Sequence, residues 1–201
     1  MAESQRQKQK DKTRKHLIDV ALEQLAKDGL TTTRTSDIAK AAKVSHGTLF
    51  AHFPTREILL DEVIEEFGMR ITKRLHELVD SNCIIKELLE AHMKGISEYE
   101  EFYTRLVSEG HLLARGARNS LLMIQSAISF HLSQVAEREM KIGIIRTMPV
   151  DLLFNTWIGL IHYYMVNRDL FAPDDSVIKV QGERLVEHYL NLISVRDNDN
   201  K

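Results

Sequence analysis

Apolar residues recur at helical spacing along most of the chain. Between Leu17 and Leu25 they fall three or four residues apart, which predicts a helix over about 12–27 that Gly29 ends in the left-handed conformation. Alternating β-branched stretches are scarce, and the chain has only three prolines and nine glycines. This pattern predicts an all-α protein.

Two short helices are expected after the first one. Thr35 is suited to be the N-cap of the first short helix, and Ser45 to be the N-cap of the second, which Pro54 then ends. A tight turn at Lys43 joins them. Thr55 is expected to cap a longer fourth helix, whose apolar residues continue at helical spacing.

Two short helices joined by a tight turn and packed on a longer one form a helix-turn-helix unit. In that unit the first residues of the second short helix point away from the core and can enter the major groove of DNA. Here those residues are His46, Gly47 and Thr48. Thr48 offers a hydroxyl and a methyl group, and His46 can donate or accept at base edges. A helical hairpin inside a bundle is the alternative interpretation of the same pattern.

Charge is distributed unevenly along the chain. Residues 1–56 hold eleven Lys and Arg against six Asp and Glu, whereas the rest has a net charge of −7. A basic front part is typical of proteins that bind the phosphate backbone, although solvated surface charge is the alternative explanation. The basic arm before residue 16 is expected to be a solvated, partly disordered tail that strengthens DNA binding non-specifically, and a specific minor-groove arm is the alternative; it contains Arg6, Lys8, Lys10, Lys12, Arg14 and Lys15.

Residues 12–60 resemble the N-terminal signature of TetR-family transcriptional regulators. The matching positions are Ile38-Ala39, Ala42, Val44-Ser45, Gly47-Thr48-Leu49, His52-Phe53 and Arg56-Glu57-Ile58-Leu59. Three positions depart from the signature. Lys43 replaces a glycine, Phe50 replaces a tyrosine whose hydroxyl reaches a phosphate, and Arg56 replaces a lysine. A left-handed Lys43 would cost roughly 1 kcal/mol.

The resemblance implies which residues contact DNA. Residues 34–36 would hold the backbone or reach a base, residues 46–48 would read bases, and residues 52, 55 and 56 would bind phosphates. The full candidate set is Arg34, Thr35, Ser36, Ser45, His46, Gly47, Thr48, Phe50, His52, Thr55 and Arg56.

The remaining chain predicts a larger helical domain. The expected domains are 1–56 for DNA binding, 57–79 for a connecting helix, and 80–201 for effector binding and dimerisation. The helix expected over 149–167 is apolar nearly all round and must be covered on two sides. The resemblance implies that this helix and the last one, 176–194, form a homodimer interface; a monomer with a central helix is the alternative.

The resemblance also implies an effector pocket. Its candidate lining residues, for each of which core packing is the better explanation, are His92, Ile96, Tyr103, Met123, His131 and Trp157. No metal-ligand spacing, catalytic motif or cofactor motif is evident. A single cysteine, and the lack of a signal peptide or of an apolar run long enough to span a membrane, suggest a cytoplasmic protein. The expected function is a non-enzymatic repressor that a small molecule releases from a palindromic operator in double-stranded DNA; the alternatives are a helical enzyme or a protein-binding adaptor.

Overall fold

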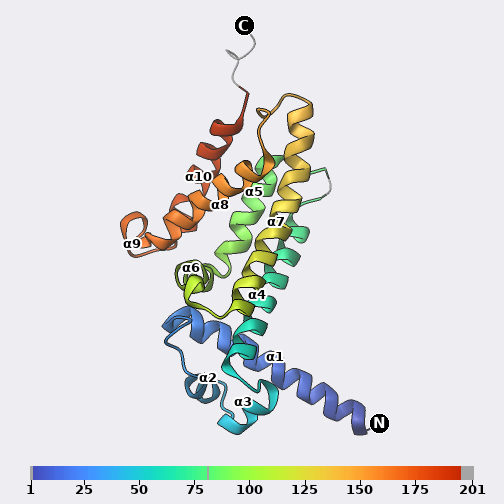
Figure 1. Ribbon diagram of the computed structural model, residues 1–201, viewed down its shortest axis with the longest axis vertical. Helices are drawn as coiled ribbons and strands as arrows, with labels where there is room; N and C mark the ends of the chain where they lie inside the picture. The colour runs from blue at the N-terminus through green and yellow to red at the C-terminus, as the bar shows by residue number, and fades with distance from the viewer. Residues whose placement is uncertain (1, 81, 196–201) are drawn as a thin grey trace. The chain divides into compact units, whose positions relative to one another are not determined.

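The computed structural model describes residues 2–80 and 82–195. Within these ranges there is no strand, and an isolated bridge joins Ile145 to Ser194. This architecture confirms the predicted all-α fold. The elements are α1 Ala2–Asp28, α2 Thr35–Ala41, α3 His46–His52, α4 Arg56–Leu78, α5 Ile85–Ser97, α6 Glu100–Glu109, the 3-10 helix Gly110–Leu112, α7 Arg115–Lys141, α8 Val150–Val166, α9 Arg168–Phe171 and α10 Val177–Ile193 (Figure 1).

The chain forms two compact units. Unit 1 comprises residues 1–69 and 101–122, and unit 2 comprises residues 70–100 and 123–201. Helices α4 and α7 each contribute residues to both units. This division follows packing, whereas the three functional domains were proposed from sequence alone and remain a prediction.

Unit 1 encloses a core of large apolar side chains contributed by α1 to α4 and α6. Phe67 lies at its centre, with its ring 5.2 Å from that of Phe102 and stacked on that of Tyr103 at 5.7 Å. The largest fully buried members are Leu17, Leu30, Leu49, Phe53, Leu59, Ile64, Phe67 and Phe102. This core holds the two short helices, which are too short to be stable alone.

Helix α1 is longer than the sequence analysis expected. It begins at Ala2, so the basic arm is helical and not a disordered tail. Residues 2–15 contain no glycine or proline and are rich in Gln, Lys and Arg, which favour helix. Gln7 supports the first turns by donating a 2.8 Å hydrogen bond to Asp11.

The core of unit 2 surrounds the single tryptophan of the chain. Trp157 is fully buried, and its ring lies 5.1 Å from that of Tyr189. The hydroxyl of Tyr189 donates a 2.5 Å hydrogen bond to the carbonyl of Leu153, which joins α10 to α8. Helix α10 also packs on α5.

Two helices of unit 2 each have a carboxylate from another helix bound at their N-terminus. Buried Glu139 accepts a 2.9 Å hydrogen bond from the backbone N–H of Ile85 at the start of α5. Glu100 accepts from the N–H of Val177, at 2.7 Å, at the start of α10. Negative charge at a helix N-terminus is stabilising, and each contact fixes one helix against another.

Several boundaries differ from the sequence-based prediction. Helix α9 lies between the helices expected over 149–167 and 176–194, where no helix was expected, and α7 begins at Arg115. Gly116 is a poor helix former, but a Cβ there would clash with Oδ2 of Asp61. Packing in unit 1 thus places Gly116 of α7 beside the carboxylate of Asp61 of α4, which local propensity does not reveal. No helix of the described residues is long and apolar enough to cross a membrane.

Candidate nucleic-acid interface

The turn between α2 and α3 is held by backbone geometry. Lys43 has a φ of 56°, in the left-handed region. Its N–H donates to the carbonyl of Lys40 at 3.1 Å, and the N–H of Val44 donates to that of Ala39 at 3.0 Å. Lys43 is therefore left-handed at the position where the family signature has glycine, so the chain carries the backbone strain there.

Helix α3 begins as the sequence predicted. Oγ of Ser45 accepts a 3.0 Å hydrogen bond from the N–H of Thr48, and lies 2.8 Å from its hydroxyl. Fully buried Leu49 anchors the opposite side of the helix. His46 and Gly47 are exposed and Thr48 is half-buried, so the first turn of α3 presents polar groups outward.

Thr35 has a different role from the one predicted. The N-cap of α2 is Arg34, and it makes no side-chain capping bond. Thr35 is the first helical residue, and its hydroxyl lies 3.0 Å from Nε2 of His46. The ring of His46 also meets that of Phe50 edge-on at 4.7 Å. The hydroxyl of Thr35 therefore joins α2 to α3, whereas a cap would have bonded to the backbone of α2 itself.

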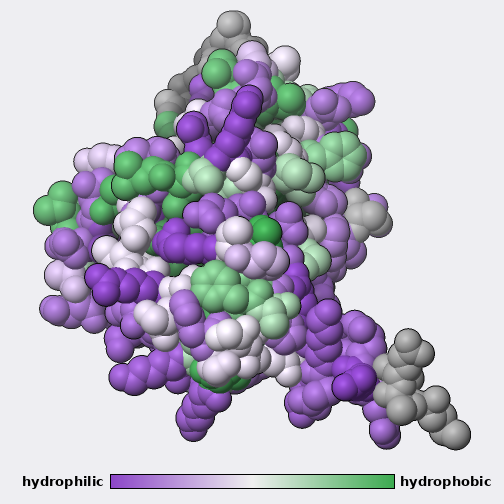
Figure 2. Space-filling model, turned by 60° about the horizontal axis from the view of Figure 1, so that its bottom comes forward, coloured by the Kyte–Doolittle hydropathy of each residue, from purple (hydrophilic) through white to green (hydrophobic). Residues whose placement is uncertain are grey.

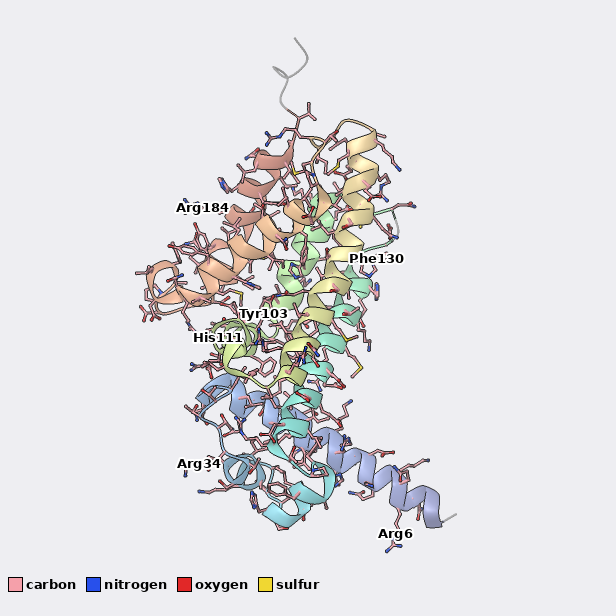
Figure 3. All side chains as sticks on the ribbon, viewed as in Figure 1. Arg6, Arg34, Tyr103, His111, Phe130 and Arg184 are labelled. Carbon is pink, nitrogen blue, oxygen red and sulfur yellow. The ribbon has the colours of Figure 1, made fainter. Side chains whose placement is uncertain are left out.

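Arg34 and Ser36 are exposed at the beginning of α2, on the same unit as α3. Figure 3 shows the side chain of Arg34 extending away from the helices. A long, exposed cationic side chain can bind a phosphate of the DNA backbone. The geometry is compatible with the backbone-contacting role that the sequence suggested for these two residues.

The predicted phosphate-binding residues have structural partners. Oγ1 of Thr55 accepts a 3.2 Å hydrogen bond from the N–H of Ile58, which confirms Thr55 as the cap of α4. Nη2 of Arg56 donates to the carbonyl of Leu30. His52 accepts a 2.7 Å hydrogen bond on its carbonyl from Arg14, and burial, Arg14 and Lys10, in that order, lower the pKa of its imidazole.

Arg14 links the basic arm to the rest of unit 1. Its guanidinium lies 4.4 Å from the centre of the Phe53 ring and forms an ion pair with Glu62. It therefore holds α1 against the end of α3 and the beginning of α4. The sequence analysis counted Arg14 only as one positive charge of the arm.

A polar contact set in unit 1, which the sequence analysis missed, joins α6 to the end of α1. Glu109 accepts hydrogen bonds from both the N–H and the hydroxyl of Thr31, each at 2.9 Å. Arg105 donates to the carbonyls of Ala26, at 3.4 Å, and Lys27, at 3.3 Å. Cations favour a helix C-terminus, so Arg105 suits the end of α1. We call these contacts the α6 clamp.

The predicted effector residues occupy three kinds of environment. His92, Ile96 and Trp157 are buried in unit 2, and Nε1 of Trp157 donates a 3.1 Å hydrogen bond to Nδ1 of His92. Tyr103 is buried in unit 1. The half-buried His131 contacts His76.

Met123 is the exception among these predicted residues. Its side chain is 74% exposed, in contrast to the buried side chains of His92, Ile96, Tyr103 and Trp157. The buried stripe of α7 in unit 2 runs through Ile124, Ile128 and Leu132, and Met123 lies beside that stripe. A surface pocket of about 320 Å³ in unit 2 contains none of the six residues; it is lined by Leu78, Val79, Asp80, Cys83, Glu87, Glu90, Ala91 and Lys94.

Comparison with solved structures identifies the fold. A TetR-family regulator from Agrobacterium tumefaciens has a TM-score of 0.76 at 16% identity, covering 92% of this chain and all of that one. FadR from Bacillus subtilis, solved in complex with stearoyl-CoA, has a TM-score of 0.70 at 20% identity, with coverage of 87% and 96%. Both similarities concern the fold alone.

Sequence relatives identify the family. Residues 17–63 match the model of bacterial regulatory proteins, tetR family. The transcriptional repressor Rv3405c of Mycobacterium tuberculosis is 33% identical over 38% of this chain, and the match spans about 40% of the length of that relative. The transcriptional regulator AcrR of Shigella flexneri is 37% identical over 92% of this chain and 93% of its own. The regulator interpretation is therefore supported over the enzyme alternative, and the chain belongs to the tetR family of bacterial regulatory proteins.

Proposed function

We propose that this protein is a repressor that binds a palindromic operator in double-stranded DNA as a homodimer. The observation that carries the proposal is the first turn of α3, where Ser45 caps the helix and leaves His46 and Gly47 exposed. This turn presents a small residue and hydrogen-bonding groups to a groove, next to the exposed Arg34 of α2.

The candidate interface residues divide into three groups. His46 and Thr48 read base edges, and Gly47 lets the backbone approach the DNA. Arg34, Ser36 and Thr55 are exposed and contact phosphates or the adjacent backbone. The remaining candidates at least partly stabilise the interface from behind. Ser45 caps α3, and Phe50 and Thr35 both contact His46. Arg56 donates a hydrogen bond to the carbonyl of Leu30, and the carbonyl of His52 accepts one from Arg14.

The dimer interface is proposed on α8 and α10. Figure 2 shows hydrophobic side chains exposed among the hydrophilic ones that cover most of the face in view. On α8, Leu152, Tyr163 and Val166 are 57%, 58% and 48% exposed and recur at helical spacing, which makes a stripe on one side of that helix. Val180 and Leu192 of α10 are 49% and 39% exposed. Burial of these residues by a second copy, in the cytoplasm, brings two α3 helices to one palindrome.

A small, mostly apolar molecule is the proposed effector. Unit 2 holds the polar atoms of His92 and Trp157 among apolar side chains, the composition of a pocket for such a ligand. FadR, which shares the fold, was solved with stearoyl-CoA. An effector that favours the conformation with lower operator affinity releases the DNA, with a typical coupling of about 1–3 kcal/mol.

Selection of bound fragments from random duplex DNA tests the proposal. The expected product is an enriched palindrome whose affinity falls steeply with salt. Leu152→Arg combined with Val180→Arg changes two exposed residues, so it is expected to leave each chain folded while lowering dimer formation and operator affinity together. Recovery of no preferred sequence, or full operator binding by a monomeric variant, would contradict the proposed mode of binding.

A further inference from the structure

Two histidines far apart in sequence meet at the surface of unit 2. Nε2 of His76, near the end of α4, lies 3.1 Å from Nε2 of His131, in the middle of α7. Their rings are nearly perpendicular, at 83°, and their centroids are 4.8 Å apart. His76 is exposed and His131 is half-buried, so the pair lies at the surface of unit 2.

This spacing fits two imidazoles that share a metal ion. If both bind through Nε2 at about 2.1 Å, with the roughly 90–110° between ligands of square-planar or tetrahedral sites, the nitrogens lie about 3.0–3.4 Å apart and the centroids about 4.6–5.3 Å apart. A head-on N–H···N hydrogen bond of the same length would separate the centroids by about 5.4 Å. The observed ring axes are therefore not collinear, and the pair is already close to the arrangement that a metal ion requires.

We propose that His76 and His131 form a binding site for a divalent first-row transition metal ion such as Ni²⁺, Cu²⁺ or Zn²⁺. Imidazole nitrogens suit these ions, whereas Mg²⁺ prefers oxygen ligands. No group of three or more His, Cys, Asp or Glu side chains is suited to hold a metal ion within residues 2–80 and 82–195. Water or an added ligand completes the coordination shell.

The surroundings keep the imidazoles available. A metal ion binds the neutral form of each imidazole. The nearest charged residues of α4 are paired with each other or with α5, as Lys73 lies 3.8 Å from Glu77 and Arg74 lies 2.7 Å from Glu98. A bound ion would join the last turns of α4 to α7 and stabilise the folded chain.

The test uses full-length protein without a polyhistidine tag, freed of metal with a chelator. Calorimetric titration with NiCl2 and with ZnCl2 is expected to give one ion per chain and a concentration-dependent rise in Tm, and MgCl2 is expected to give neither. The variants His76→Ala and His131→Phe are expected to bind at least tenfold more weakly. His131→Phe keeps an aromatic ring on the same helix, and His111→Ala removes an exposed histidine elsewhere and should leave binding unchanged.

Wild-type protein with one equivalent of Cu²⁺ provides a readout that does not depend on the folding of any variant. Its electron paramagnetic resonance spectrum is expected to show coupling to two imidazole nitrogens. Absence of Ni²⁺ and Zn²⁺ binding, a Cu²⁺ spectrum with one nitrogen or none, or unchanged binding in both His76→Ala and His131→Phe would overturn the proposal. It does not depend on operator binding, so its failure would leave the proposed function intact.

Discussion

Trp157 donates a 3.1 Å hydrogen bond from Nε1 to Nδ1 of His92 inside unit 2. Because the indole can only donate, Nδ1 must accept, and the neutral imidazole carries its proton on Nε2. That atom is buried without a hydrogen-bond partner in the described part of the protein. Burial, and secondarily His162, lower the pKa of His92 to about 4. The hydrogen bond from Trp157 thus fixes the tautomer of His92, and burial keeps the imidazole of His92 neutral in the core.

Stability is expected to fall in acid because of this histidine and His162. Burial lowers the pKa of His162 to about 4 as well. Above pH 6.5 the imidazoles are neutral in both states, and their contribution is fully present. Between pH 6.5 and 4 only the unfolded chain takes up these protons, so the free energy of unfolding should fall by up to about 3 kcal/mol for each histidine. Below pH 4 this decrease ends.

Urea denaturation at several pH values measures the effect. His92→Phe is expected to be less stable than wild type at pH 7, because Nε1 of Trp157 loses its acceptor. Its free energy of unfolding should nevertheless fall less than that of wild type between pH 6.5 and 4. His188→Phe changes an exposed histidine and is expected to keep the wild-type pH dependence. An identical pH profile for wild type and His92→Phe would rule out His92 as a source of the acid sensitivity.

Lys43→Gly is expected to stabilise the protein by about 1 kcal/mol. At a φ of 56° the lysine side chain is strained, and glycine removes the strain. The matched control is Lys40→Gly in α2, which removes the same charge from a helix and should destabilise by about 0.5–1 kcal/mol. Chemical denaturation measures both. Effects of the same sign would refute the assignment of strain to the turn.

Loss of Glu109 is expected to weaken the α6 clamp. Its carboxylate accepts two 2.9 Å hydrogen bonds from Thr31. Glu109→Ala should therefore lower the free energy of unfolding by about 1–3 kcal/mol, the usual range for hydrogen bonds to a charged group. Glu101→Ala, at an exposed position of the same helix, should change it by less than about 0.5 kcal/mol. Equal losses in the two variants would show that the clamp adds little.

Base contacts by α3 predict a sequence-dependent loss of affinity. Thr48→Ala or His46→Ala should weaken the best site by about 1–3 kcal/mol and alter base preference. Thr48→Val is a useful partner, because it keeps the methyl group and removes the hydroxyl that lies 2.8 Å from Ser45. Competition assays with operator variants measure the preference. Uniform losses on all duplexes would assign these residues to the DNA backbone.

Salt titration separates phosphate contacts from structural ones. Arg34→Ala should weaken all duplexes and reduce the slope of log affinity against log salt by about one. Arg56→Ala should reduce the slope similarly if a free nitrogen of its guanidinium binds phosphate, and it should also lower stability because Leu30 loses its donor. An unchanged slope for Arg56→Ala would give this residue a purely structural role.

Local features were predictable from the sequence. The caps at Ser45 and Thr55 each involve a side chain and an N–H three residues later, so a short stretch contains both partners. The left-handed turn at Lys43 and the end of α3 before Pro54 are equally local. For the same reason the two short helices and the turn between them could be placed from neighbouring residues, although their stability needs the core of unit 1.

The contacts that give these residues their partners were decided by tertiary structure. Thr35 was predicted as a cap from its neighbours, but its hydroxyl bonds His46 because α2 and α3 pack together. Glu109 meets Thr31 across 78 residues, and His131 meets His76 across 55. Helical periodicity places a residue on a face of its own helix but leaves open which helix covers that face. Only packing of the whole chain brings such pairs together. Packing also decides that the side chain of Met123 is exposed, although methionine is an apolar residue typical of a core.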